Sequence, residues 1–199
     1  MLDNAGARAK ISVLVDPVAA ALTKRGVAPD AVTWAGAIGS IATSALFIAH
    51  GHFFLGAIFQ GLFACSDLID GAMARQQSRV GSWGAFLDST LDRVSDSAVL
   101  CALIVWFAHQ QSAVLVAVTC LALVTGFLTS YIRARAEAVG VSCKVGFAER
   151  AERSLLVWIG MLLAGVGVPI LGLTMWVLAA ASTVTVGQRM SYVRKQLDA

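Results

Sequence analysis

Residues 67–92 read DLIDGAMARQQSRVGSWGAFLDSTLD, a charged stretch that lies between two long apolar runs of the chain. It carries four carboxylates, on Asp67, Asp70, Asp88 and Asp92. An ionisable side chain near the centre of a membrane helix costs about 2.5 to 3.5 kcal/mol, so acids at membrane depth usually mark a functional site. Four acids in one short stretch make that interpretation stronger.

The composition excludes an ordinary soluble globule. Hydrophobic residues make up 58% of the 199 positions and charged residues only 14%, with a mean hydropathy of +0.76. These values predict an integral membrane protein. The net charge of +3 is small, and the basic residues do not form one soluble face, so no nucleic-acid partner is expected.

The apolar pattern predicts an all-α membrane fold with six transmembrane helices. Six segments have roughly the 20 residues that a helix needs to cross a bilayer. They cover residues 32–50, 53–75, 84–108, 112–136, 151–168 and 169–190. Residues 8–25 alternate apolar clusters with charges at helical spacing, which predicts an amphipathic juxtamembrane helix on the membrane surface. We therefore expect a juxtamembrane segment over residues 1–31 and a six-helix domain over residues 32–199.

The charges predict the orientation in the membrane. All 15 Lys and Arg residues lie before the first span, in the second and fourth connections or the span ends beside them, or at and after the end of the last span. The positive-inside rule then places both termini and the even-numbered connections in the cytoplasm. All 12 acidic residues fall on the same side. We expect a multi-pass plasma-membrane protein whose charged stretch is reached from the cytoplasm.

The four cysteines do not indicate a metal site or a disulfide. Cys65, Cys101, Cys120 and Cys143 lie far apart, and three of them fall inside apolar runs. Buried thiols are the expected outcome.

The spacing of the four acids predicts a divalent-metal site. Asp67 and Asp70 are three residues apart and Asp88 and Asp92 four apart, so each pair shares a helix face. A short connection makes the two helices antiparallel neighbours, and four nearby carboxylates repel one another unless a cation compensates them. The three histidines, His50, His52 and His109, are predicted at the opposite membrane face, so they cannot serve as ligands beside the acids. All-oxygen ligands favour one or two ions of Mg²⁺ or Mn²⁺.

Other interpretations remain open at this point. Gly71, Ala74 and Gly84 could admit a ligand or simply allow helices to pack, and Arg75 could bind phosphate or extend to the interface. The acids could instead form interfacial ion pairs, which suits Asp96 better than the other four. A divalent-cation transporter is a further alternative. However, no charged residue continues toward the other membrane face, which favours a metalloenzyme that handles phosphate.

The pattern D67-x2-D70-G71-x2-A74-R75-x8-G84-x3-D88-x3-D92 resembles the motif of the CDP-alcohol phosphotransferases at every fixed position. These are integral membrane enzymes of phospholipid synthesis. The resemblance implies six transmembrane helices, a homodimer in the lipid bilayer, a cavity that faces the cytoplasm, and two divalent cations, Mg²⁺ or Mn²⁺.

The resemblance also implies roles for individual residues. Asp67, Asp70 and Asp88 would ligate metal, and Asp92 would complete the metal site and act as general base. The residues that would bind the CDP-linked lipid are Asp30, Ala31, Val32, Thr33, Gly71, Ala74, Arg75 and Gly81. For the segment A28-P29-D30-A31-V32-T33, the alternative is that Asp30 or Thr33 only caps the first span.

The acceptor is indicated by a second set of residues. The segments S130-Y131-I132-R133-A134-R135-A136-E137 and F147-A148-E149-R150-A151-E152-R153 resemble those of actinobacterial phosphatidylinositol phosphate synthases. That resemblance implies transfer of a phosphatidyl group from CDP-diacylglycerol to inositol 1-phosphate, with release of CMP. The candidate acceptor-phosphate ligands are Ser130, Arg133, Arg135, Arg150, Arg153 and Arg189.

Two alternatives apply to this second set. The arginines could merely follow the positive-inside rule or bind anionic lipid. The enzyme could also be a phosphatidylglycerophosphate synthase, whose acceptor is glycerol 3-phosphate. Relatives tend to have proline where this chain has Ala151, and we expect little effect because both residues suit the first turn of a helix.

Overall fold

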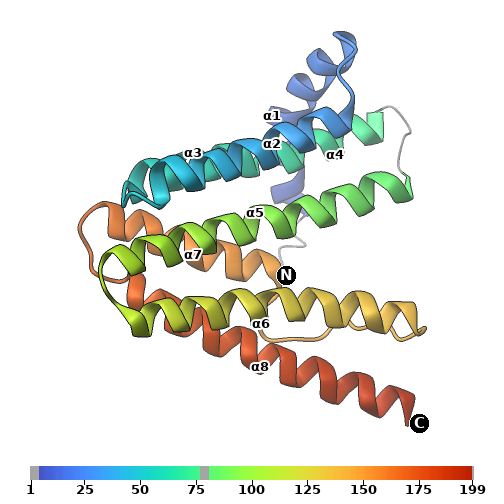
Figure 1. Cartoon of the computed structure of the whole chain (residues 1–199). Helices are drawn as coiled ribbons and strands as arrows, with labels where there is room; N and C mark the ends of the chain where they lie inside the picture. The colour runs from blue at the N-terminus through green and yellow to red at the C-terminus, as the bar shows by residue number, and fades with distance from the viewer. Residues whose placement is uncertain (1–4, 77–80, 199) are drawn as a thin grey trace. The chain divides into compact units, whose positions relative to one another are not determined.

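The computed structural model describes residues 5–76 and 81–198, with the side chains of residues 5–12 and 14 excepted (Figure 1). The described backbone is helical, with no strand in those ranges. Its elements are α1 (Ala5–Lys24), α2 (Pro29–Thr43), the π-helix η1 (Ser44–Ile48), α3 (Phe53–Ala64), α4 (Ser66–Gln76), α5 (Ser82–His109), α6 (Ala113–Ala138), α7 (Arg150–Gly165) and α8 (Leu171–Leu197). Arg79, which contributed to the predicted charge pattern, lies outside the described residues.

Each of the six predicted apolar segments coincides with helical structure. Within the described residues, four helical stretches are long and apolar enough to cross a membrane: Pro29–Ile48, Phe53–Gln76, Ala113–Ala138 and Leu171–Leu197. This all-helical architecture is that of an integral membrane protein. A helix is also present over most of the predicted juxtamembrane segment, as α1.

The first span begins earlier than its apolar run suggested. Helix α2 starts at Pro29, and proline is well suited to a first helical position because its missing N–H has no helical partner there. Asp30 and Thr33 therefore lie inside the helix, which does not fit the alternative that one of them caps the first span. Their side chains are bonded to other helices instead, as described below.

Two local breaks divide the first two spans. The first span, Pro29–Ile48, ends in the π-helix η1. The second span, Phe53–Gln76, is interrupted at Cys65, between α3 and α4. The π-helix lies within continuous apolar sequence, so hydropathy alone gives no sign of it, whereas the interruption at Cys65 directly precedes the charged stretch.

The structure divides into two compact units, which are described separately. The first comprises residues 1–43 and 59–95, and the second comprises residues 44–58 and 96–199. Helix α5 contributes to both units, with its N-terminal half in the first.

In the first unit, α4 packs against both α1 and α2. Ala19 of α1 is buried with Ala72 and Met73 of α4. A Cβ atom added to Gly36 of α2 would collide with the side chain of Ser66, so the missing side chain is what allows α2 to lie so close to α4. This close approach determines where the two helices present their polar residues.

Nearby, a polar pair joins α2 to α3. Ser40 Oγ donates to Gln60 Oε1 at 2.8 Å, and Gln60 Nε2 donates to the Ser40 carbonyl at 2.9 Å. Hydrogen bonds between apolar helices hold them together where burial of side chains in lipid gives little driving force.

In the second unit, α8 packs along α6 and against α7 (Figure 1). The core includes Leu103, Phe107, Met161 and Met175, all of them almost fully buried. Buried threonines in α6 and α8 donate to carbonyls in the preceding turn of their own helix, which satisfies their hydroxyls in an apolar environment. They are Thr119, Thr125, Thr129, Thr174 and Thr185.

The predicted burial of the thiols is correct only for Cys143. The other three, Cys65, Cys101 and Cys120, are exposed on the protein surface, and all four are free. Apolar residues surround these three cysteines in the sequence because helix faces that point away from a membrane protein's core are apolar too.

Candidate metal centre and phosphate-binding residues

Three acids converge in the first unit. Carboxylate oxygens of Asp67 and Asp70, from α4, and of Asp88, from α5, all lie within 4.8 Å of one another. The two α4 acids share a face because they are one helical turn apart. The spacing argument predicted a group of four acids, and the structure brings three of them together, with Asp88 approaching from the following helix.

The group suits a hard divalent cation. Its members supply only carboxylate oxygens, the ligands that Mg²⁺ and Mn²⁺ prefer. Asp70 is buried, and its Oδ2 accepts a 2.6 Å hydrogen bond from the Thr33 hydroxyl of α2. Asp67 is exposed, so the group is open on one side. Catalytic metal sites commonly combine ligands oriented by hydrogen bonds with a position left open to substrate.

Asp92 lies one turn after Asp88 on α5 and is not part of the three-acid group among the described residues. Its Oδ2 is 3.8 Å from Nη1 of Arg93, which also donates to the Ser89 carbonyl. The assignments of Asp92 as metal ligand and general base remain predictions.

The small residues near the acids leave open space. A Cβ atom added to Gly81 or Gly84 would meet no described atom within 4 Å, and at Gly71 it would meet only Arg75 Nη1, at 3.4 Å. Helix packing against Gly84, one of the alternatives, is therefore not seen in the described part of the chain. Arg75 is exposed in the last turn of α4, and Ala74 is half-buried beside it.

The start of α2 is attached to the start of α5 by a contact that sequence reasoning missed. The indole Nε1 of Trp83 donates to Asp30 Oδ2 at 3.0 Å. Next to Asp30, Ala31 is exposed, and Val32 packs against the buried α1–α4 cluster. The signal in the sequence was a tryptophan in the first turn of α5, at the edge of the charged stretch.

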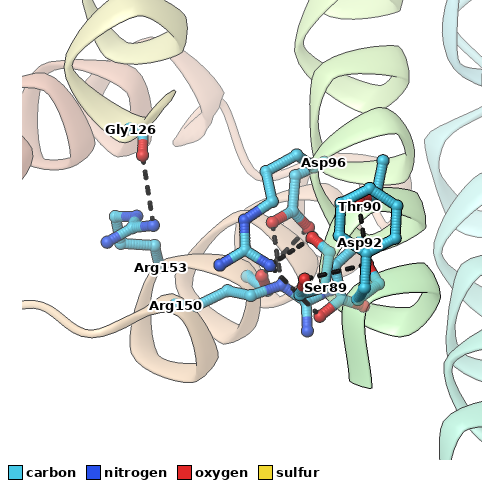
Figure 2. A network of polar contacts seen from close by, with 10 residues as sticks. Ser89, Thr90, Asp92, Asp96, Gly126, Arg150 and Arg153 are labelled. Carbon is cyan, nitrogen blue, oxygen red and sulfur yellow. Dashed lines mark hydrogen bonds and ion pairs between the residues drawn. The ribbon is translucent and has the colours of Figure 1, made fainter. Parts of the chain in front are cut away.

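In the second unit, Asp96 forms the ion pair that was considered for it. Arg150 Nε donates to Asp96 Oδ2 at 3.0 Å (Figure 2). Ser154 Oγ donates to Asp96 Oδ1 at 3.3 Å. This pair connects α5 to the start of α7. Arg150, a predicted phosphate ligand, is thus held by a carboxylate in this structure.

Two more of the candidate arginines hold backbone carbonyls. Arg153 donates from Nη1 to Ala148 O at 2.9 Å and lies with Nη2 at 3.5 Å from Gly126 O (Figure 2). Arg189 is 5% exposed and donates from Nε to Val145 O at 2.8 Å and from Nη1 to Thr129 O. Both guanidiniums are fixed in position, and Arg189 fastens the segment before α7 to α6 and α8.

The α6 candidates are more exposed. Arg133 pairs with Glu137 at 3.1 Å on the surface of the last turns of α6, and Arg135 is exposed as well. Ser130 is half-buried one turn earlier. An exposed ion pair of this kind contributes about 0.2 to 1 kcal/mol, so Arg133 is readily available to exchange partners.

The segment before α7 also borders an open pocket of about 480 Å³ in the second unit. Its lining residues are Val145, Gly146, Phe147, Gln188, Ser191, Tyr192 and Lys195. Phe147 N–H donates to Gln188 Oε1 at 2.8 Å and Ala148 N–H to Thr185 Oγ1 at 3.0 Å, so side chains of α8 fix the backbone of this segment.

The apolar helices are those of a helical membrane protein. The group of three acids, with Asp70 buried and hydrogen-bonded, is a candidate divalent-metal centre in it. The family model described as CDP-alcohol phosphatidyltransferase matches residues 26–187. The chain belongs to this family.

Curated relatives are similar over nearly the whole chain. Phosphatidylinositol phosphate synthase of Streptomyces avermitilis is 43% identical, over 97% of this chain and 83% of the relative. The enzyme of the same name from Cutibacterium acnes is 38% identical, over 96% of this chain and 97% of the relative.

Solved structures are similar as well. The crystal structure of Mycobacterium tuberculosis phosphatidylinositol phosphate synthase with CDP-DAG bound gives a TM-score of 0.87 at 40% identity, covering 90% of this chain and 92% of that one. The structure of the same enzyme in complex with manganese and citrate also gives 0.87, covering 90% and 88%.

Proposed function

We propose that this protein transfers the phosphatidyl group of CDP-diacylglycerol to inositol 1-phosphate, giving phosphatidylinositol phosphate and CMP. It is a metal-dependent transferase of phospholipid biosynthesis. The observation that carries the proposal is the group of Asp67, Asp70 and Asp88 in a chain 43% identical to a phosphatidylinositol phosphate synthase along nearly its whole length.

Asp67, Asp70 and Asp88 would hold the metal, with Asp92 completing the site. Two divalent cations, Mg²⁺ or Mn²⁺, supply charge neutralisation for the pyrophosphate of the donor when they are bound. A mycobacterial relative that was solved with manganese supports this choice of ion. Thr33 would keep the Asp70 carboxylate oriented through its 2.6 Å hydrogen bond.

Asp92 would act as the general base. Its carboxylate accepts the proton of an acceptor hydroxyl while that oxygen attacks the β-phosphorus of CDP-diacylglycerol. A new oxygen–phosphorus bond forms to the acceptor, and the bond from the β-phosphorus to the bridging oxygen of the pyrophosphate breaks. CMP leaves with the electron pair of that bond. The position of Asp92 one turn beyond Asp88 supports this role.

The donor would be bound by residues around the open side of the acidic group. The fork of Arg75 is suited to phosphate oxygens, and the bare backbone at Gly71 and Gly81 permits close approach of a nucleotide. The proposed donor site comprises Asp30, Ala31, Val32, Thr33, Gly71, Ala74, Arg75 and Gly81.

The acceptor phosphate would be bound by residues of the second unit. Arg153 and Arg189 are held by carbonyls, so little side-chain entropy is lost when they bind an anion. Arg150 would exchange its Asp96 partner for phosphate. The proposed acceptor site comprises Ser130, Arg133, Arg135, Arg150, Arg153 and Arg189.

The membrane arrangement completes the proposal. Residues 1–31 would form a juxtamembrane segment, with α1 lying on the membrane surface, and residues 32–199 a domain of six transmembrane helices. The charge distribution supports a plasma-membrane protein with both termini and the active site in the cytoplasm. Membership of the family supports a homodimer in the bilayer.

One experiment tests the acceptor. Purified protein is incubated with CDP-diacylglycerol, Mn²⁺ or Mg²⁺, and either inositol 1-phosphate, glycerol 3-phosphate or free inositol, and CMP is measured. We expect metal-dependent CMP release with inositol 1-phosphate. Release with glycerol 3-phosphate alone would identify a phosphatidylglycerophosphate synthase, and divalent-cation flux in proteoliposomes without CMP formation would favour a transporter.

A further inference from the structure

The start of α2 and the start of α5 are connected by one directional contact. Trp83 Nε1 donates to Asp30 Oδ2 at 3.0 Å, although 53 residues separate them in the sequence. Both side chains belong to the first turns of their helices. A hydrogen bond to a charged acceptor is about twice as strong as one between neutral groups, so it can select one orientation of the carboxylate.

This contact lies on the face of α2 that also reaches the acidic group. Asp30 and Thr33 are one turn apart and share a helix face. Thr33 is bonded to Asp70 of α4, and Asp30 is bonded to Trp83 of α5. One face of α2 is therefore attached to both helices that supply the three-acid group.

The indole is not buried by the fold. Trp83 is 61% exposed, and its ring lies 5.8 Å from that of Phe86, which is 59% exposed. Because little of the ring is packed, burial does not explain the orientation of Trp83. Among the described residues, its specific contacts include the hydrogen bond to the Asp30 carboxylate and the ring contact with Phe86.

We infer that Trp83 is a positioning residue for the CDP-linked donor: its indole N–H fixes the Asp30 carboxylate at the edge of the donor site. This inference rests on the proposed function, in which Asp30 contacts the nucleotide. Without the indole, the Asp30 side chain could turn back toward the N-terminal end of α2, whose helix dipole attracts carboxylates.

The test is Trp83→Phe, which keeps an aromatic ring and removes the N–H donor. We expect the KM for CDP-diacylglycerol to rise about tenfold, as for the loss of a hydrogen bond to a charged group. We expect kcat, the KM for inositol 1-phosphate and the Mn²⁺ requirement to stay within about twofold. The matched control is Trp106→Phe, a change in the second unit that should leave all four values unaltered.

A double-mutant cycle separates positioning from a general structural effect. Asp30→Ala alone should raise the KM for the donor, and adding Trp83→Phe to it should raise that KM no further. An unchanged donor KM in Trp83→Phe would overturn the inference and leave Trp83 as an aromatic membrane-interface residue. If Asp30→Ala and Trp83→Phe raise the donor KM independently, so that their effects multiply in the double variant, the inference is overturned as well.

A readout without turnover keeps this inference distinguishable from the proposed function. CDP in the presence of Mn²⁺ should raise the melting temperature of the wild-type protein, and Trp83→Phe should reduce that increase while leaving the melting temperature without CDP unchanged. If the wild type binds CDP but forms no CMP with any acceptor, the proposed function fails and the role of Trp83 is still decided. If CDP raises the melting temperature of Trp83→Phe as much as that of the wild type, the positioning role of Trp83 is contradicted.

Discussion

The hydroxyl of Thr33 donates a 2.6 Å hydrogen bond to the carboxylate of Asp70, joining α2 to α4 across 37 residues of sequence. Both side chains are buried, whereas Asp67 in the same acidic group is exposed. The most enclosed member of the candidate metal centre is thus oriented by a residue that is not itself an acid.

Thr33→Val should weaken metal binding without unfolding the protein, because valine keeps the shape of threonine and removes its hydroxyl. Residues that orient metal ligands typically contribute about 10- to 100-fold in metal affinity or activity. The Mn²⁺ concentration for half-maximal CMP release should rise within that range. Thr33→Ser, which retains the hydroxyl, is the matched control; a value for Thr33→Val equal to that of Thr33→Ser would contradict the role.

Asp92→Asn should abolish CMP release and spare donor binding. The amide cannot take the acceptor proton, and loss of a general base typically costs about 10²- to 10⁴-fold in rate. The CDP-induced increase in melting temperature with Mn²⁺ present should persist. Asp96→Asn, one turn further on α5, is the comparison: activity lost equally in both variants would argue against a special role for Asp92.

Arg153→Ala should impair use of the acceptor more than use of the donor. Loss of charge-assisted hydrogen bonds to a phosphate corresponds to about 10- to 100-fold in kcat/KM for inositol 1-phosphate. The KM for CDP-diacylglycerol should change little. Arg194→Ala removes an exposed arginine that pairs locally with Asp198, and it serves as the control. Full activity of Arg153→Ala at limiting acceptor would refute the acceptor-site assignment.

Arg189→Ala should destabilise the protein as well as impair catalysis. The change would leave the carbonyls of Val145 and Thr129 without their guanidinium donor, and a buried polar group left unsatisfied costs about 1 to 3 kcal/mol. The melting temperature should therefore fall by roughly 5 °C or more. Arg189→Lys retains a donor and should restore part of the stability; a wild-type melting temperature in Arg189→Ala would show that these contacts contribute little.

Much of the acidic group could be predicted from spacing. Asp67 and Asp70 share a helix face, and the short connection to α5 brings Asp88 to the same place, so regular helix geometry was sufficient. The ion pair of Asp96 with Arg150 also agrees with the alternative weighed for Asp96. These predictions depended on helix periodicity and charge, both of which are visible in the sequence.

Other features depend on tertiary structure that no local pattern encodes. The bond from Trp83 to Asp30 requires knowledge of how α5 begins relative to α2. The start of α2 was misplaced because the apolar run begins later than the helix, which Pro29 initiates. The thiols were misjudged because apolar sequence in a membrane protein is typical of outward faces as well as of the core.

The segment E149-R150-A151-E152-R153 divides its charges between two tasks. Glu149 and Glu152 form a capping box at the start of α7, with Glu149 N–H donating to Glu152 Oε2 at 2.6 Å. The arginines between and after them reach Asp96 and the carbonyls of neighbouring segments. Ala151 takes part in neither set of contacts through its side chain.

Ala151 is the second residue of α7, where a backbone N–H has no acceptor within the helix. Proline at this position would therefore remove no helical hydrogen bond. Exchange between alanine and proline here should therefore be close to neutral, since it alters neither the glutamates that begin the helix nor the arginines that extend from it. Sequence drift at position 151 should consequently carry no information about the acceptor, whereas a change at either neighbouring arginine should.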